Sequence, residues 1–193
     1  GMRWSIEGHT FRRISGRKLF LKIGASFLKK ILLILLALLC LSFPALAEQT
    51  AQKTIATSLY SIDLPENWQV IEQTEPAGLN IIVFTSKTHD AVVTLVQGSA
   101  GDSDLNTIAE SFAEQYKAHE KPVYKDDVAY FNYTTYEGDD GSARIMVQDG
   151  QFIVATMSGD LHRSRIFLSK FSSEKFDGLF SSEETTKKRR DSK

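Results

Sequence analysis

The stretch that decides the fold is LNIIVFTSKTHDAVVTLV, residues 79–96. Two runs rich in β-branched and aromatic residues, 79–85 and 91–96, flank the polar residues 87–90, which is typical of two strands joined by a turn. Alternate residues of a strand point to opposite sides of a sheet. In each run, consecutive apolar residues therefore place apolar side chains on both faces. The pattern predicts two neighbouring strands in central positions of a β-sheet.

More strands are predicted on both sides of this stretch. Residues 60–64 alternate between apolar and polar, Pro65 breaks that strand because proline cannot continue a ladder, and Trp68 begins the next strand. Residues 128–136, 143–147 and 152–157 predict three later strands, with Asp149 and Gly150 as a type I′ turn between the last two.

Two amphipathic helices complete the pattern. Apolar residues recur at helical spacing over 105–116, and Ser103 or Asp104 can cap this helix. Asp160 can cap a second helix over 161–170, in which Ile166 and Phe167 are predicted to lie off the apolar face. The expected fold class is a single α+β domain over residues 57–180, with a mostly antiparallel sheet of six to seven strands covered by two main helices. Its apolar residues, Trp68 and Phe112 among them, are expected to share one core.

Residues 1–47 have the three parts of a secretory signal peptide: a long basic n-region, the apolar run ILLILLALL at 31–39, and ALA at 45–47. Cleavage is predicted between Ala47 and Glu48, which places the protein in the periplasm or outside the cell. Two alternatives remain, in which 31–47 is kept as an anchor in the inner membrane or Cys40 is lipid-modified. Residues 48–56 are expected to be a flexible leader, and residues 181–193 a disordered basic tail.

The net negative charge of the chain after the leader argues against nucleic acid as a partner. Residues 48–193 hold 15 Lys and Arg against 23 Asp and Glu, a net charge of −8. Such a domain repels phosphate, so binding to nucleic acid is not expected. Membrane contact is expected only through the uncleaved leader, or weakly through the basic tail.

No catalytic, cofactor-binding or metal-ligating set of residues is evident in the sequence. The four histidines lack metal-ligand spacing, and neither a G-x-S-x-G motif nor a glycine-rich nucleotide loop is present. We therefore expect no cofactor, no metal and no enzymatic activity. An alternative is a hydrolase whose site gathers scattered carboxylates such as Asp63, Asp90 and Asp127.

The segment YSIDLPENW at residues 60–68 resembles the opening of small exported domains of the PsbP-like/DcrB-like type, whose fold is shared with a nuclear import factor that binds the GTPase Ran. In this resemblance Pro65 and Trp68 are a structural turn and a core anchor. The family resemblance implies a binding or assembly module without a cofactor of its own.

These observations favour an exported, non-enzymatic binding or assembly module of the bacterial cell envelope. Its partner would be an unknown envelope protein or a small ligand, and a monomer is expected. Besides the hydrolase, a second alternative is a stress or quality-control protein that pairs with clients through an exposed sheet edge.

Overall fold

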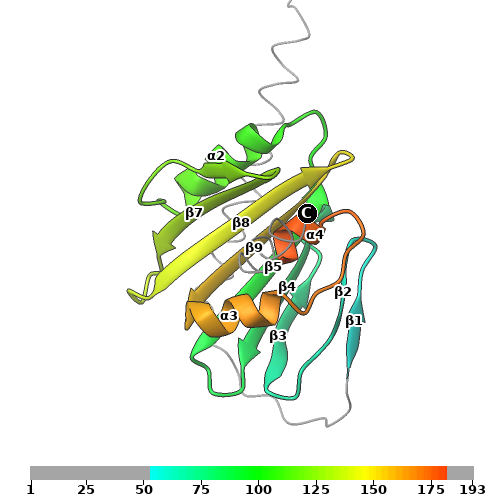
Figure 1. The fold of residues 1–193 in the computed structure, drawn as a ribbon, viewed down its shortest axis with the longest axis vertical. Coiled ribbons are helices and arrows are strands. Elements are labelled where there is room, and N and C mark those ends of the chain that lie inside the picture. Colours follow the sequence, from blue (N-terminus) through cyan, green and yellow to red (C-terminus); the bar gives the residue numbers. More distant parts are fainter. Residues whose placement is uncertain (1–52, 182–193) are drawn as a thin grey trace, which may run out of the picture. The chain divides into compact units, whose positions relative to one another are not determined.

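A seven-stranded antiparallel β-sheet forms the centre of the protein, in the order β3-β4-β5-β9-β8-β7-β6 (Figure 1). The computed structural model describes residues 53–181, which all belong to one compact unit. The strands of this sheet are β3 (Trp68–Thr74), β4 (Asn80–Ser86), β5 (Ala91–Ser99), β6 (Val123–Lys125), β7 (Val128–Thr134), β8 (Asp140–Gln148) and β9 (Gln151–Gly159). As the sequence predicted, β4 and β5 each have a neighbour on both sides.

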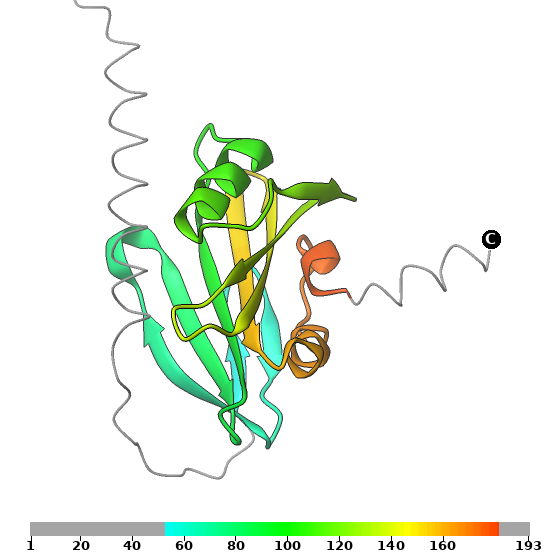
Figure 2. The ribbon, with the colours of Figure 1, turned by 90° about the vertical axis from the view of Figure 1, so that its left-hand side faces the viewer.

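Helices and a second, smaller sheet cover the two faces of the large one. The remaining elements are β1 (Thr54–Ala56), β2 (Ser61–Asp63), η1 (Pro76–Gly78), α2 (Leu105–Gln115), α3 (Leu161–Leu168) and α4 (Asp177–Phe180). Figure 2 shows α2 on one side of the large sheet, and α3 and α4 on the other. The predicted fold class is confirmed: residues 53–181 form one α+β domain with an antiparallel sheet and two main helices.

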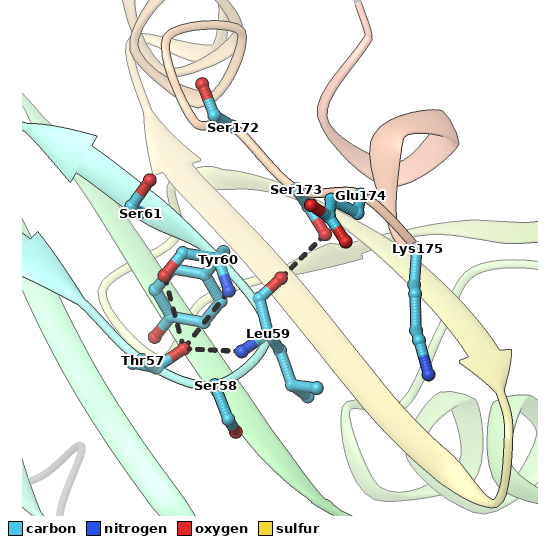
Figure 3. A pocket seen from close by; sticks show the side chains of 9 residues that line it. All are labelled: Thr57, Ser58, Leu59, Tyr60, Ser61, Ser172, Ser173, Glu174 and Lys175. Atoms are coloured by element: carbon cyan, nitrogen blue, oxygen red, sulfur yellow. Dashed lines mark hydrogen bonds between the residues drawn. The ribbon is translucent and has the colours of Figure 1, made fainter.

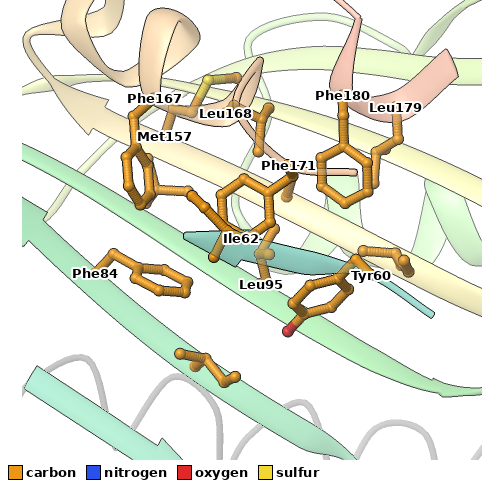
Figure 4. Close-up of a cluster of buried hydrophobic side chains, with 14 of the residues drawn as sticks. Tyr60, Ile62, Phe84, Leu95, Met157, Phe167, Leu168, Phe171, Leu179 and Phe180 are labelled. Atoms are coloured by element: carbon orange, nitrogen blue, oxygen red, sulfur yellow. The ribbon is translucent and has the colours of Figure 1, made fainter. Parts of the chain in front are cut away.

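The expectation of a single core was wrong, because both faces of the large sheet are covered and each has its own apolar layer. Towards α3, side chains such as Phe84, Leu95 and Met157 pack with those of α3 and α4 (Figure 4). Alternate residues of the same strands point to α2, where the Phe112 ring lies 6.1 Å from that of Phe152. Trp68 and Phe112 are therefore both buried, but on opposite faces.

Both predicted helix caps are present. The Asp104 carboxylate accepts a hydrogen bond from the Thr107 amide at 2.8 Å, and that of Asp160 accepts one from the Arg163 amide at 2.9 Å. These carboxylates satisfy amides that have no partner within the first turn. The hairpin at Asp149 and Gly150 is also confirmed, since both residues have the positive φ of a type I′ turn.

Three local expectations need correction. Residues 54–56, placed in the flexible leader, form β1 and pair with β2. The short elements β6 and α4 were missed, because three or four residues are too few to show a period. Phe167 was placed off the apolar face of its helix, yet it is fully buried and Ile166 beside it is half exposed. The rest of the expected leader, residues 48–52, lies outside the described residues, as do residues 182–193 of the expected tail.

Candidate functional site

Pro65 and Trp68 form the turn that joins β2 to β3. The Trp68 amide donates to the Pro65 carbonyl at 3.0 Å, and the indole is 4% exposed. The indole stacks on the Phe167 ring with the two centroids 3.8 Å apart and the planes 14° from parallel. Trp68 thus joins the edge of the sheet to α3, and neither residue lines the pocket described next. The expected cleavage site, Ala47 and Glu48, lies outside the described residues.

A pocket of about 220 Å³ lies between two segments that are far apart in the sequence (Figure 3). One wall is the loop from β1 to β2, and the other is the connection from α3 to α4. We call it the loop pocket. Its lining residues are Thr57, Ser58, Leu59, Tyr60, Ser61, Ser172, Ser173, Glu174 and Lys175.

Hydroxyl groups fix the two walls of the loop pocket. In the first wall, the Thr57 hydroxyl accepts hydrogen bonds from the amides of Leu59 and Tyr60 at 3.1 and 3.2 Å, which folds the loop into a Thr-based turn. In the second, the Ser173 hydroxyl accepts from the Phe176 amide at 3.0 Å and donates across the pocket to the Leu59 carbonyl at 2.6 Å. Each wall is therefore ordered locally and tied to the other.

A backbone bridge adds to this link. The amides of Ser61 and Ser172 each donate to the carbonyl of the other at 2.9 Å. Such reciprocal bonds are those of a short antiparallel pair. The bridge and the Ser173 bond fix the shape of the pocket before any ligand arrives.

Below the loop pocket, the Tyr60 ring enters the core and packs edge-on against Phe171 and Phe180, with centroids 5.6 and 6.0 Å away. Its hydroxyl is buried and has no hydrogen-bond partner among the described residues. Burial raises the pKa of this hydroxyl far above its usual value, so the group stays protonated and neutral.

The rim of the loop pocket carries charges of both signs. Glu174 and Lys175 are exposed, and the Lys175 ammonium lies 2.6 Å from the carboxylate of Asp149, in the β8–β9 turn. The hydrogen bond to Asp149 and its negative charge raise the pKa of Lys175. A pocket lined by hydroxyl groups, with the acid Glu174 and the base Lys175 at its rim, suits a ligand that carries polar or zwitterionic groups. The hydroxyls of Thr57 and Ser173 form their hydrogen bonds with backbone groups, and neither is bonded to the side chain of Glu174 or Lys175 as a nucleophile would be to its base.

The structure separates two of the three carboxylates of the hydrolase alternative, Asp90 and Asp127. Asp63 ends β2 in the small sheet, Asp90 precedes β5, and Asp127 precedes β7. Val128, the first residue of β7, is aligned across β8 and β9 with Gln97 on β5. Gln97 lies six residues after Ala91, the first residue of β5. At about 3.3 Å per residue, Asp127 and Asp90 are about 20 Å apart along the strands. They cannot act on one bond.

Asp90 instead belongs to a polar cluster that was not expected from the sequence. Its carboxylate accepts hydrogen bonds from the hydroxyls of Ser86 and Thr88, both at 2.7 Å, and from the Arg163 guanidinium at 2.8 Å. The bonds from Ser86 and Thr88, then the charge of Arg163, lower the pKa of Asp90. The cluster fastens the β4–β5 turn to the first turn of α3. The turn at Asp90 and the Asp160 cap were visible in the sequence, but the link to Arg163, 73 residues away, was not.

The two edges of the large sheet are β3 and β6. The seven-residue β3 carries a bulge between Val70 and Glu72, whereas β6 has three residues. A bulge and a short edge strand both oppose pairing with other chains. The long unprotected edge that client binding would require is not found among residues 53–181.

Residues 53–181 contain neither a metal-binding cluster nor a membrane-spanning helix. No three His, Cys, Asp or Glu side chains lie where they could share a metal ion. Within the same range, every helix is too short or too polar to span a bilayer.

Comparisons with known proteins found similarity in structure. No family model matches the chain, and neither does any curated protein sequence. The chain is similar to the solution structure of cyanobacterial PsbP (CyanoP) from Synechocystis sp. PCC 6803, with 12% sequence identity and a TM-score of 0.43. The match covers 69% of this chain and 98% of that chain. The resemblance to DcrB-like proteins and to the Ran-binding import factor stays a prediction.

Proposed function

We propose that this protein is an exported, non-enzymatic binding or assembly module of the bacterial cell envelope, and that the loop pocket is its binding site. The observation that carries the proposal is the link between the two walls, made by the Ser61–Ser172 bridge and by the Ser173 hydroxyl on the Leu59 carbonyl. A pocket whose walls are already fixed loses little conformational entropy when a ligand binds.

The size and lining of the loop pocket limit its ligand. About 220 Å³ is below the usual range for drug-sized molecules, so it suits one side chain of a partner protein or a small polar molecule. Hydroxyls, with Glu174 and Lys175 at the rim, favour a ligand that offers both donors and acceptors. The partner is then an envelope protein or a small polar ligand, and not a nucleic acid.

Export is supported by the sequence. The basic region, the apolar run at 31–39 and the ALA at 45–47 favour transport and cleavage between Ala47 and Glu48, which gives a periplasmic or secreted protein. Retention of 31–47 as an inner-membrane anchor is the alternative. Sequencing the N-terminus of the protein recovered from cells separates the two, since cleavage makes Glu48 the first residue.

The binding proposal is tested by filling the loop pocket. Ser58 lines it and is exposed, so Ser58→Trp places a bulky side chain there without disturbing the core. Asn106→Trp is the matched control, because Asn106 is also exposed but lies on α2. Affinity capture from the protein's own envelope, followed by mass spectrometry, should recover a partner or ligand with the wild type and Asn106→Trp, and lose it with Ser58→Trp. Equal recovery with all three would refute the loop pocket as the site.

A further inference from the structure

The edge strand β6 exposes apolar side chains. Four large apolar side chains among residues 53–181 are exposed, and two of them, Val123 at 63% and Tyr124 at 43%, are on this strand of three residues. Consecutive strand residues point to opposite sides, so one side chain is uncovered on each face of the edge. Beyond its pairing with β7, β6 has the open backbone groups of an edge strand.

Carboxylates surround β6 on both faces and at its end. On the α2 side, the charges of Glu110 and Asp104 act on Tyr124. At the end of the strand, Asp126 and Asp127 form the exposed two-residue turn into β7. The cation within β6 is Lys125. An added strand at this edge would therefore meet mostly negative charge.

On the other face, α4 lies directly against the β6–β7 turn (Figure 2). A Cβ atom on Gly178 would lie 3.6 Å from the Val128 side chain and 3.9 Å from the Asp126 carbonyl. Asp177, the first residue of α4, is exposed and adds another carboxylate on this side.

The chain leaves the described region close to this edge. The Arg144 guanidinium, on β8, donates to the carbonyls of Leu179 and Ser181 at 3.2 and 2.9 Å. Arg144 is in register with Tyr130 on β7, and Tyr130 with Val123 on β6. Neighbouring strands are about 4.8 Å apart, so the backbone of Arg144, whose side chain holds Ser181, lies about 10 Å from β6.

We propose that residues 185–190, TTKKRR, pair with β6 as an eighth strand of the large sheet. Between Ser181 and Thr185 lie three residues, and a chain of that length can span about 10 Å, which is enough to reach this edge. The two threonines favour strand conformation, and the four following cations meet the carboxylates around β6. Exposed ion pairs are weak, so the pairing is reversible and falls with ionic strength.

Hydrogen–deuterium exchange of the full chain tests this pairing. We compare the wild type with K187Q/K188Q/R189Q/R190Q, which removes the four charges, and with Thr186→Pro, which keeps them but removes a backbone donor from the added strand. The peptide that contains β6 should exchange about threefold faster in both variants, and in the wild type at 0.5 M salt. The peptide that contains β3, the opposite edge, is the internal control and should not change.

Three results would overturn the proposal. Equal exchange of β6 in the wild type and the charge variant would mean that the segment does not bind there. Slow exchange that persists in Thr186→Pro but not in the charge variant would show a contact of charges without a strand. Protection that increases with protein concentration would make the occupant a second copy of the chain.

Discussion

Phe167 and Ile166 are neighbours on α3 with opposite environments, and replacing each by alanine tests how that helix packs. Phe167 is fully buried: its ring stacks on Trp68 and lies 5.2 Å from that of Phe84 and 5.4 Å from that of Phe171. Phe167→Ala leaves a cavity and breaks these three contacts, so we expect a loss of about 4 kcal/mol in the free energy of unfolding.

Ile166→Ala is the matched control for this prediction. Ile166 is 50% exposed, and the change should alter the free energy of unfolding by less than about 0.5 kcal/mol. Urea unfolding followed by circular dichroism measures both variants against the wild type. A difference between the two variants below about 1 kcal/mol would refute the packing of α3, and a larger loss for Ile166→Ala would mean that the helix is rotated.

Three further predictions concern stability. Gly141→Ala should destabilise by about 1–3 kcal/mol in urea unfolding, because its Cβ would enter the space of the Tyr133 ring; an unchanged midpoint would contradict this. Ala77→Gly should stabilise by about 0.5–1 kcal/mol in the same assay, since Ala77 is exposed at a φ of 52°, which glycine adopts without strain; a loss would count against it. The pKa of Asp90 lies below its ordinary 3.8, chiefly through the Ser86 hydrogen bond. The carboxylate of Asp90 therefore stabilises the fold fully above about pH 3.8, and this stabilisation is lost as the pH falls through the lower pKa of the folded state. Asp90→Asn should therefore lower Tm more at pH 7 than at pH 2, and an equal loss at both would contradict the assignment.

Local patterns in the sequence predicted most of the large sheet and both main helices. The period of apolar residues over 105–116 located α2, and the carboxylates of Asp104 and Asp160 marked the first turns of α2 and α3. Asp149 and Gly150 located the β8–β9 hairpin. Each of these features depends on residues within one or two turns of the chain, which is the range over which sequence periodicity is informative.

The packing of the elements depends on contacts between distant residues, and here the sequence was insufficient. The rotation of α3 is decided by the stack of Phe167 on Trp68, 99 residues apart, and not by the period of its eight residues. A second apolar layer on the α2 side could have been inferred from the two-sided apolar character of β4 and β5, which already implied that both faces are covered.

The loop pocket was missed for the same reason. The Ser173 hydroxyl bonds the carbonyl of Leu59, 114 residues earlier, and both segments read as ordinary polar connections. Serine in such segments usually caps a turn, as Ser173 also does for the Phe176 amide. No property of either segment alone shows that they meet.

Photo-crosslinking in living cells tests the binding role of the loop pocket most directly. A photoreactive amino acid replaces Ser58 at the pocket or, as the control, Asn106 on α2. We predict that position 58 forms a defined adduct with an envelope protein or a small ligand after export, and that position 106 does not. The same adducts from both positions, or none from position 58 in cells that export the protein, would contradict the account.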